Sequence, residues 1–366
     1  MNHYKIFFLL AVVLLASCKS PFEKIDPSEP VVVRDNYGDA AHYFYSDVDY
    51  NYPSDANYEM GDAIVSSPVN SLEVDWVFGS VKVAYYDGKE VRCTEQNDNP
   101  TEITRMRYWL DGTTLRIRFS KSGQYEMRLK QKDLTILLPN LSKPNLRINT
   151  ASASVSIEGI STKEINVDAS SGDIVLENVK ASSLDLRNIS GDITLTNVTA
   201  NRLDMETSSG DEKMSGCNFK ITNVESISGE VSLSESGCSS LNMETSSGNV
   251  ETNNIQCETC KVESVSGDIS MNGTVKHDTE LETSSGNVFL CGLKSGSCSV
   301  ETVSGDVSLY GSEKNLEVSF KTVSGEFDSS IPFTKNGDVY KMGNGGVKID
   351  VETASGDMNV IKPKKF

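Results

Sequence analysis

The chain is poor in basic residues and in histidine, and both shortages restrict what it can do. Lysine and arginine number 34 against 52 aspartate and glutamate residues, which gives a formal net charge of −18. Nucleic acid and anionic lipid carry negative charge and attract clusters of Lys and Arg. The charge balance therefore argues against nucleic acid as a partner. The one compact basic cluster, KPKK at 362–365, closes the chain and is explained as well by a solvated tail.

Catalytic arrangements are scarce as well. His42 and His277 are the only histidines beyond residue 18, no serine lies in Gly-x-Ser-x-Gly, and no histidine is placed to serve a triad. Carboxylates are plentiful, which leaves a carbohydrate-active β-helix enzyme as an alternative. Such enzymes carry site residues that interrupt their repeat, whereas the acids here follow it. We therefore expect a protein that is not an enzyme and has neither a cofactor nor a metal site.

The longest apolar run stands at the start of the chain. MNHYK is followed by IFFLLAVVLL, which is too short to span a bilayer as a stable helix, and then by Ala16, Ser17 and Cys18. A basic start, an apolar core and small residues predict a secretory signal. Leu15 to Cys18 resembles the bacterial lipobox, which implies a lipoprotein signal peptide over 1–17 and lipidation of Cys18. The alternative is an ordinary signal peptide with an incidental cysteine.

The residues after Cys18 indicate where such an anchor would lie. Lys19 and Ser20 follow it instead of the aspartate that retains some lipoproteins at the inner membrane. We therefore expect an outer-membrane anchor, with the cell-surface face and the periplasmic face of that membrane as alternative locations. Residues 18–62 are acidic and rich in tyrosine and proline, which predicts a tether. Its aromatics either fold back onto the following sheet or stack on sugars.

Residues 63–145 alternate between apolar and polar side chains, as in Leu72–Trp76, Leu115–Phe119 and Leu134–Leu138, with Asp-Gly turns between. This period of two predicts strands and hairpins, and we interpret the segment as a β-rich N-terminal cap.

A 19-residue repeat fills most of the remainder, from about 146 to 362. A Ser-Gly motif marks eleven units, with Ala153 in the place of the first glycine and an expected hairpin insertion near 328–346. The glycines are Gly172, Gly191, Gly210, Gly229, Gly248, Gly267, Gly286, Gly305, Gly325 and Gly356. Fixed self-similarity of this length is typical of a solenoid.

The columns of the repeat predict how each unit is built. Apolar residues lie two and four positions after the glycine and five before it, as in Ile174, Leu176 and Val167. They describe two short strands with a bend at Ser-Gly, where we expect glycine to supply a positive φ. Stacked units would form one core with rungs about 4.8 Å apart. Serine alternates with Ile or Val two positions before the glycine, so a coil of two units competes with the favoured coil of one.

The string [VL]-E-T-[SV]-S-G-[DN]-[VI]-x-[LM], repeated after a β-rich segment that ends in Leu138-Pro139, resembles the bacterial putative-adhesin family of SGD-repeat β-solenoids. The resemblance covers roughly 70–361. It implies an all-β fold with a right-handed, single-stranded parallel β-helix on an envelope protein, and it implies no chemistry. Ala153, the acidic Glu212 in an apolar column and the stretched last interval depart from the pattern.

Two acidic columns accompany the glycines, one directly after the glycine and one four positions before it. The first suits either weak Ca²⁺ sites or, as we favour, carboxylates that accept backbone N–H groups at a turn. The second contains Glu206, Glu225, Glu244, Glu263, Glu282, Glu301 and Glu352. Of the cysteines beyond Cys18, most are interpreted as small buried apolar residues, although Cys238 and Cys257 are 19 apart and could face each other.

These features favour a non-enzymatic envelope lipoprotein, an adhesin-like binding or scaffold module that is held to the membrane by a lipid and carries a glycan or protein ligand at the cell surface. A periplasmic structural or envelope-stress module is the alternative.

Overall fold

The computed structural model describes residues 55–98, 100–121, 131–292, 294–311 and 315–362. The expected signal peptide, Cys18 and nearly all of the expected tether lie outside these ranges. The described chain is all β, with one 3-10 turn, η2 (Asp55–Asn57), and strands β1 to β30 in a single hydrogen-bonded sheet. The predicted fold class, an all-β parallel solenoid, is confirmed.

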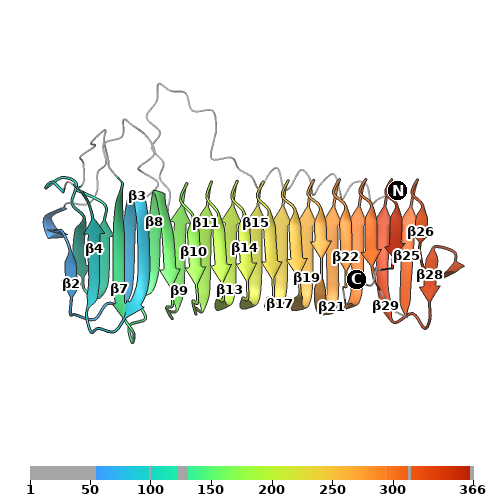
Figure 1. Cartoon of the computed structure of the whole chain (residues 1–366), viewed down its shortest axis with the longest axis horizontal. Helices are drawn as coiled ribbons and strands as arrows, with labels where there is room; N and C mark the ends of the chain where they lie inside the picture. The colour runs from blue at the N-terminus through green and yellow to red at the C-terminus, as the bar shows by residue number, and fades with distance from the viewer. Residues whose placement is uncertain (1–54, 99, 122–130, 293, 312–314, 363–366) are drawn as a thin grey trace, which may run out of the picture. The chain divides into compact units, whose positions relative to one another are not determined.

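One coil of the solenoid takes one 19-residue unit. Ile174 in β10 (Ile174–Glu177) pairs in parallel with Val155 on one side and with Ile193 on the other. Leu186 in β11 (Ser183–Asn188) pairs in the same way with Val167 and Met205. Each step between partners is nineteen residues, so neighbouring units are neighbouring rungs. The coil of two units is therefore excluded. Figure 1 shows the strands of the repeat following one another along the stack.

Each rung has three sides. In the rung that begins at Glu164, outward side chains come in consecutive pairs at 170–171, 177–178 and 182–183, and inward and outward residues alternate between these corners. The first side precedes the Ser-Gly corner, the second side follows it, and a short third side of about three residues leads to the next rung.

The first side is built, in spatial order, by β9 (Glu164–Ala169), β11 (Ser183–Asn188), β13 (Thr199–Thr207), β15 (Asn218–Ser226), β17 (Gly237–Thr245), β19 (Ile255–Ser264), β21 (Gly273–Thr283), β23 (Lys294–Thr302), β29 (Val347–Thr353) and β25 (Leu316–Thr322). The second side is built by β10 (Ile174–Glu177), β12 (Ile193–Thr196), β14 (Glu212–Ser215), β16 (Val231–Ser234), β18 (Val250–Asn253), β20 (Ile269–Met271), β22 (Val288–Cys291), β24 (Val307–Tyr310), β30 (Met358–Ile361) and β26 (Phe327–Ser329).

At the N-terminal end the spatial order departs from the chain order. β3 (Ser71–Tyr86) pairs in parallel with β8 (Asn145–Glu158) on one edge and with β6 (Thr114–Arg118) and β7 (Lys132–Pro139) on the other. Gly79 lies opposite Ala153, so β3 occupies the register of the repeat. We expected 63–145 to precede the solenoid as a cap, but β3, β6 and β7 are rungs of the same stack. Around them, β1 (Glu59–Met60), β2 (Ala63–Val65), β4 (Val91–Gln96) and β5 (Arg107–Asp111) pair antiparallel.

At the C-terminal end the spatial order of the strands also departs from the chain order. β29 pairs in parallel with β23 on one edge and with β25 on the other, so the last coil of the chain lies between two earlier coils. The expected insertion is a hairpin of β27 (Thr334–Asn336) and β28 (Val339–Met342), and β28 pairs antiparallel with β25. Phe327 stacks on Tyr340 with ring centroids 3.6 Å apart. Both ends of the repeat are therefore closed by a strand inserted out of sequence order.

The core consists of the inward columns of all three sides, and it is continuous along the stack. Residues such as Leu176, Val224, Val262 and Val300 are fully buried. The register passes without a shift through Glu212, which pairs with Ile193 and Val231, so the acidic residue does not disturb the regularity of the rungs.

Candidate functional site

At the Ser-Gly corner the main chains of neighbouring rungs are in close contact. The repeat glycines are not among the residues with positive φ, so the expected reason for their presence is wrong. A Cβ on Gly267 would overlap the carbonyl oxygen of Gly248, and the other glycines of the column are in the same situation with the preceding rung. Glycine is present because main chain packs directly on main chain, where any side chain would force the rungs apart.

Positive φ occurs at the second corner instead, where the second side ends. Gly and Asn adopt this left-handed region most readily, and both are common at this corner. The residues are Gly159, Asn178, Asn197, Gly216, Glu235, Asn254 and Gly292. Asn197 donates its side-chain amide to Asn178 at 3.2 Å, so this corner is also tied between rungs. The sequence signal for it, an Asn or Gly six residues after several Ser-Gly glycines, was present but was not used to predict this corner.

The acidic column directly after the glycine is structural. The backbone N–H of Asp192 donates to the side chain of Asp173 at 3.1 Å, and this bond recurs between rungs. The further donor and acceptor pairs are Asp211 and Asp192, Glu230 and Asp211, Asp268 and Asn249, Asn287 and Asp268, Asp306 and Asn287, Asp357 and Asp306, and Glu326 and Asp357. The predicted use of these side chains as acceptors at the turn is confirmed.

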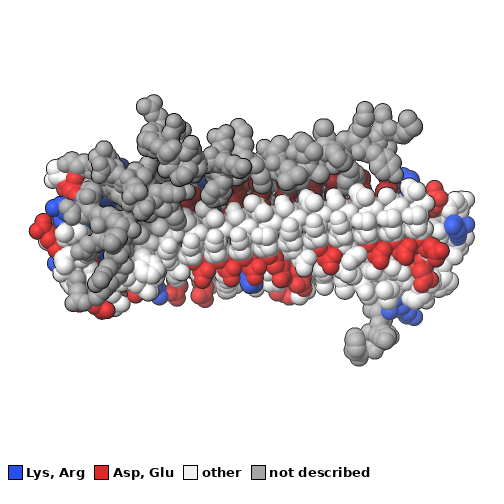
Figure 2. All heavy atoms as spheres, turned by 90° about the horizontal axis from the view of Figure 1, so that it is seen from above, with Lys and Arg blue, Asp and Glu red and all other residues white. Residues whose placement is uncertain are grey.

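The second acidic column forms an outward ladder on the first side, the Glu ladder. Its members are paired in register on consecutive strands: Glu206, Glu225, Glu244, Glu263, Glu282, Glu301 and Glu352. Burial, followed by the charges of neighbouring carboxylates, raises the pKa of Glu225 and of Glu282. Figure 2 shows Asp and Glu gathered in rows along the stack with few basic residues among them.

A basic residue stands at each end of the Glu ladder. Arg187 lies in register beside Glu206 and contacts it at 3.3 Å, and Lys321 lies in register beside Glu352 and forms an ion pair with it. Within the ladder, Lys261 contacts Glu263 at 2.7 Å. The ladder therefore has a defined length, with its charge compensated at both ends.

One acid departs from the repeat and lies inside the stack. Glu212 is 0% exposed in a column that is otherwise apolar, and it accepts a hydrogen bond from the Thr207 hydroxyl. Burial raises the pKa of Glu212 to about 7 because the charged form loses its hydration, and this outweighs the hydrogen bonds from Thr207 and Ser226. Within the described residues its Oε2 atom has no hydrogen-bond partner.

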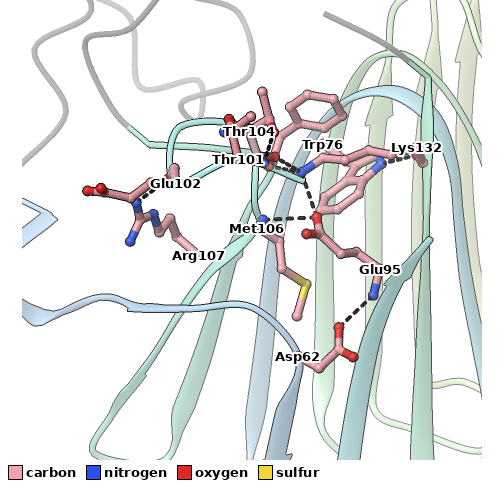
Figure 3. A network of polar contacts seen from close by, with 10 residues as sticks. Asp62, Trp76, Glu95, Thr101, Glu102, Thr104, Met106, Arg107 and Lys132 are labelled. Atoms are coloured by element: carbon pink, nitrogen blue, oxygen red, sulfur yellow. Dashed lines mark hydrogen bonds and ion pairs between the residues drawn. The ribbon is translucent and has the colours of Figure 1, made fainter. Parts of the chain in front are cut away.

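A buried ion pair lies at the N-terminal end of the stack (Figure 3). Lys132 occupies the register position opposite Gly79, and its Nζ contacts Glu95 at 2.8 Å and donates to the carbonyl oxygen of Thr104 at 2.7 Å. The same Nζ is 4.8 Å from the centroid of the Trp76 ring. Burial lowers the pKa of Lys132 to about 8, although Glu95 opposes this change. The network joins the loops of this end to the first rungs, which is a structural role.

Within the described ranges, no group of three or more His, Cys, Asp or Glu side chains is arranged to hold a metal ion. No helix among these residues is long and apolar enough to cross a membrane.

These features define a parallel β-solenoid whose inward columns form the core and whose outward columns repeat from rung to rung. The chain belongs to the Toastrack DUF4097 family, whose model matches residues 69–237 and 215–361. No curated protein matches it.

Among solved structures, the chain is similar to a "putative lipid binding protein" of Parabacteroides distasonis, with 15% identity, 86% of this chain and 99% of that chain covered, and a TM-score of 0.38. It is also similar to a "putative adhesin" of Parabacteroides merdae, with 10% identity, 84% and 97% covered and a TM-score of 0.31. A "putative cell adhesion protein" of Clostridium sporogenes shows 11% identity, 83% and 100% covered and a TM-score of 0.18.

Proposed function

We propose that this protein is a non-enzymatic lipoprotein of the cell envelope that binds a polymeric ligand, a glycan or a protein, through the outward columns of its solenoid. The observation that carries the proposal is the Glu ladder, in which consecutive rungs present the same carboxylate in register. Neighbouring strands are about 4.8 Å apart, so the ladder offers closely and evenly spaced acceptors. A ligand that repeats a hydroxyl or a cationic group can make many weak contacts at once, and such contacts reinforce one another.

The environment of the carboxylates supports binding over catalysis. General acid and base catalysis needs a carboxyl group with a shifted pKa that can reach the substrate. Glu212 has the shifted pKa and breaks the repeat, but it is 0% exposed in the core. The exposed acids recur from rung to rung, which suits a surface that binds a ligand through many equivalent contacts.

A binding experiment with two matched variants tests the proposal. The fragment 55–366 is applied to a glycan array and to extracellular-matrix proteins. The first variant replaces Glu225, Glu244 and Glu263 by Gln, and the second replaces the outward acids Glu158, Glu177 and Glu251, which lie on the second side. We expect binding by the fragment, a loss of at least tenfold in the first variant and little change in the second. Uniformly negative arrays, or equal losses in both variants, would remove the support for this surface.

The lipid anchor rests on Cys18 and is tested separately. We expect Cys18→Ser to abolish labelling of the full chain with radioactive palmitate and to release the protein from the membrane fraction. Ser17→Ala is the control, because it changes the neighbouring residue and keeps the thiol. Labelling that persists in Cys18→Ser would show that the lipobox interpretation is wrong.

The location of the anchored protein decides between surface adhesion and a periplasmic structural module. We expect a protease added to intact cells to degrade the chain while a periplasmic marker survives. If the chain also survives until the outer membrane is opened, the periplasmic module becomes the better interpretation.

A further inference from the structure

Two cysteine side chains face each other across neighbouring rungs of the first side. Cys238 in β17 and Cys257 in β19 are directly paired in the parallel register, and their Sγ atoms are 2.8 Å apart. Cys257 is 2% exposed, whereas Cys238 is partly buried against the core. In register on adjacent parallel strands, both side chains point to the same side of the sheet.

The backbone geometry at this pair suits a disulfide. Parallel neighbours are about 4.8 Å apart, which lies within the range of about 4.4–6.8 Å found between the Cα atoms of bridged cysteines. The sulfur atoms must approach from 2.8 Å to about 2.05 Å, a movement of less than about 1 Å. The register of the two rungs already places the two thiols side by side.

The remaining cysteines of the described chain occupy other columns. Cys260 is paired with Leu241 and Thr279, and Cys298 is paired with Thr279 and Ile349, so an intervening rung separates these two thiols. Cys93 is paired with Ala63 and Ile136, and Cys291 with Tyr310. Cys217 lies just before β15, and its thiol donates to the carbonyl oxygen of Ser215 at 3.4 Å. Among the described residues, Cys238 and Cys257 are the only two cysteines that are direct strand partners.

We propose that Cys238 and Cys257 form a disulfide that fastens two rungs in the middle of the stack. The oxidant is a disulfide-bonded donor, either a small oxidised thiol or a protein disulfide. The thiolate of Cys238, the more accessible residue, attacks the donor disulfide and releases one donor thiol. The sulfur of Cys257 then attacks the Cys238 sulfur and displaces the second donor thiol. The two cysteines lose two protons and two electrons, and the donor disulfide is reduced to two thiols.

The position of the two sulfur atoms assists the second step, because the Cys257 sulfur already lies 2.8 Å from the Cys238 sulfur that it attacks. Because each rung of a solenoid is stabilised by its nearest neighbours, a covalent link between two central rungs opposes opening of the stack at that point. A disulfide also stabilises by restricting the unfolded chain.

The test uses the full chain under native conditions with oxidised glutathione as the donor. After alkylation in denaturant, we expect two fewer free thiols for each chain than in the reduced protein. A protease that cleaves after glutamate separates the three nearby cysteines: Cys238 falls in peptide 236–244, Cys257 in 252–258 and Cys260 in 259–263. We expect peptides 236–244 and 252–258 to run as one species that reductant separates, lighter than their sum by two hydrogen atoms.

Variants complete the design. Cys257→Ser should retain glutathione on Cys238, and Cys238→Ser should leave the thiol count unchanged. Cys291→Ser, the control, should still form the cross-link, and reductant should lower the urea midpoint of the wild type but not that of Cys238→Ser. Three results in the wild type would each overturn the proposal: an unchanged thiol count, glutathione that stays on Cys238, or a link between peptides 252–258 and 259–263. These readouts do not depend on how the variants fold.

Discussion

At the Ser-Gly corner, the addition of a single methyl group is enough to disturb the packing of the rungs. Each repeat glycine of the column lies against the carbonyl group of a neighbouring rung. The main-chain N–H of most of these glycines donates to the side chain three positions earlier, as Gly267 does to the Ser264 hydroxyl at 2.8 Å. The corner is therefore packed from both directions, and a side chain has no space to enter.

The first prediction concerns this packing. Gly267→Ala places a Cβ where the carbonyl oxygen of Gly248 lies, and we expect it to lower the free energy of unfolding by about 3 kcal/mol, the upper range for overpacking. The urea midpoint, followed by circular dichroism, measures the change. Ala153→Gly in the same column is the control, because β8 already accommodates this methyl group, and it should cost less than about 1 kcal/mol. Equal midpoints for wild type and Gly267→Ala would contradict the close packing.

A second prediction concerns Glu212. Its pKa rises from 4.5 to about 7 on folding, so the penalty for its charge is absent below pH 4.5, grows between these values and is complete above pH 7. At 1.36 kcal/mol for each pKa unit, the complete penalty is about 3 kcal/mol. We expect Glu212→Val to be more stable than the wild type at pH 8 and to lose most of this advantage at pH 4.

Thermal midpoints over this pH range provide the measurement. Glu230→Gln is the control, because it removes an exposed charge one rung away and should leave the shape of the profile unchanged. Parallel profiles for the wild type and Glu212→Val would show that the buried carboxyl group has no part in the pH dependence.

At the scale of elements, the ends of the stack differ from its middle in how the strands are ordered. β3 and β29 are each held on both edges by parallel partners, although one is the first long strand and the other belongs to the last coil. The insertion secures the segments near the chain ends, which would otherwise be the first to fray.

This order reverses an expectation based on position in the chain. Gly356 lies nearest the C-terminus of the repeat glycines, and from position in the chain alone its replacement by valine would cost less than that of Gly267. In the structure Gly356 packs between Gly305 and Gly325, and Gly325 belongs to the outermost rung. We now predict that Gly356→Val lowers the urea midpoint about as much as Gly267→Val and that Gly325→Val lowers it less. A smaller effect of Gly356→Val than of Gly325→Val would contradict the inserted coil.

The buried pair Lys132 and Glu95 supports the N-terminal end. Removing one partner leaves an uncompensated buried charge, so we expect Lys132→Met to cost about 3–5 kcal/mol. Lys132→Met combined with Glu95→Leu should recover much of this loss, because both charges are then absent. Lys82→Met breaks the exposed pair with Glu158 and should cost less than about 1 kcal/mol. Chemical denaturation measures all three, and additive losses in the double variant would argue against the pair.

At the scale of the whole molecule, the negative charge acts on stability through repulsion. The formal net charge is −18, and the Glu ladder places carboxylates on neighbouring strands. Exposed charges are screened within about 10 Å at 0.1 M salt. We therefore predict that the thermal midpoint rises between about 10 mM and 300 mM NaCl.

Variants identify the source of this salt effect. Glu244→Lys breaks the ladder in its middle and should flatten the dependence on salt, whereas Asp98→Asn, an exposed acid of the N-terminal end, should change it little. If the two variants respond alike, the repulsion belongs to the net charge as a whole and not to the ladder.

Sequence alone determined the period, the fold class and the inward columns of this protein. Every rung has the same local pattern, so the burial of residues such as Ile174 and Leu176 can be predicted from their spacing alone. The acceptor role of Asp173 could also be predicted, because it depends on contacts one repeat away. Gly79, with Val74 before it and Val81 and Val83 after it, carried the same signal outside the regular spacing and was missed.

The tertiary structure decided which rungs are neighbours at the two ends. It thereby decided which residues surround Gly356, Lys132 and the aromatic pair Phe327 and Tyr340. It also decided that the repeat glycines serve close packing while Asn178 and its equivalents supply the positive φ. The physical reason is the separation along the chain between the residues that pair. A repeat encodes contacts between units 19 residues apart, but the insertion of β3 and β29 depends on pairing between distant segments, which no local period records.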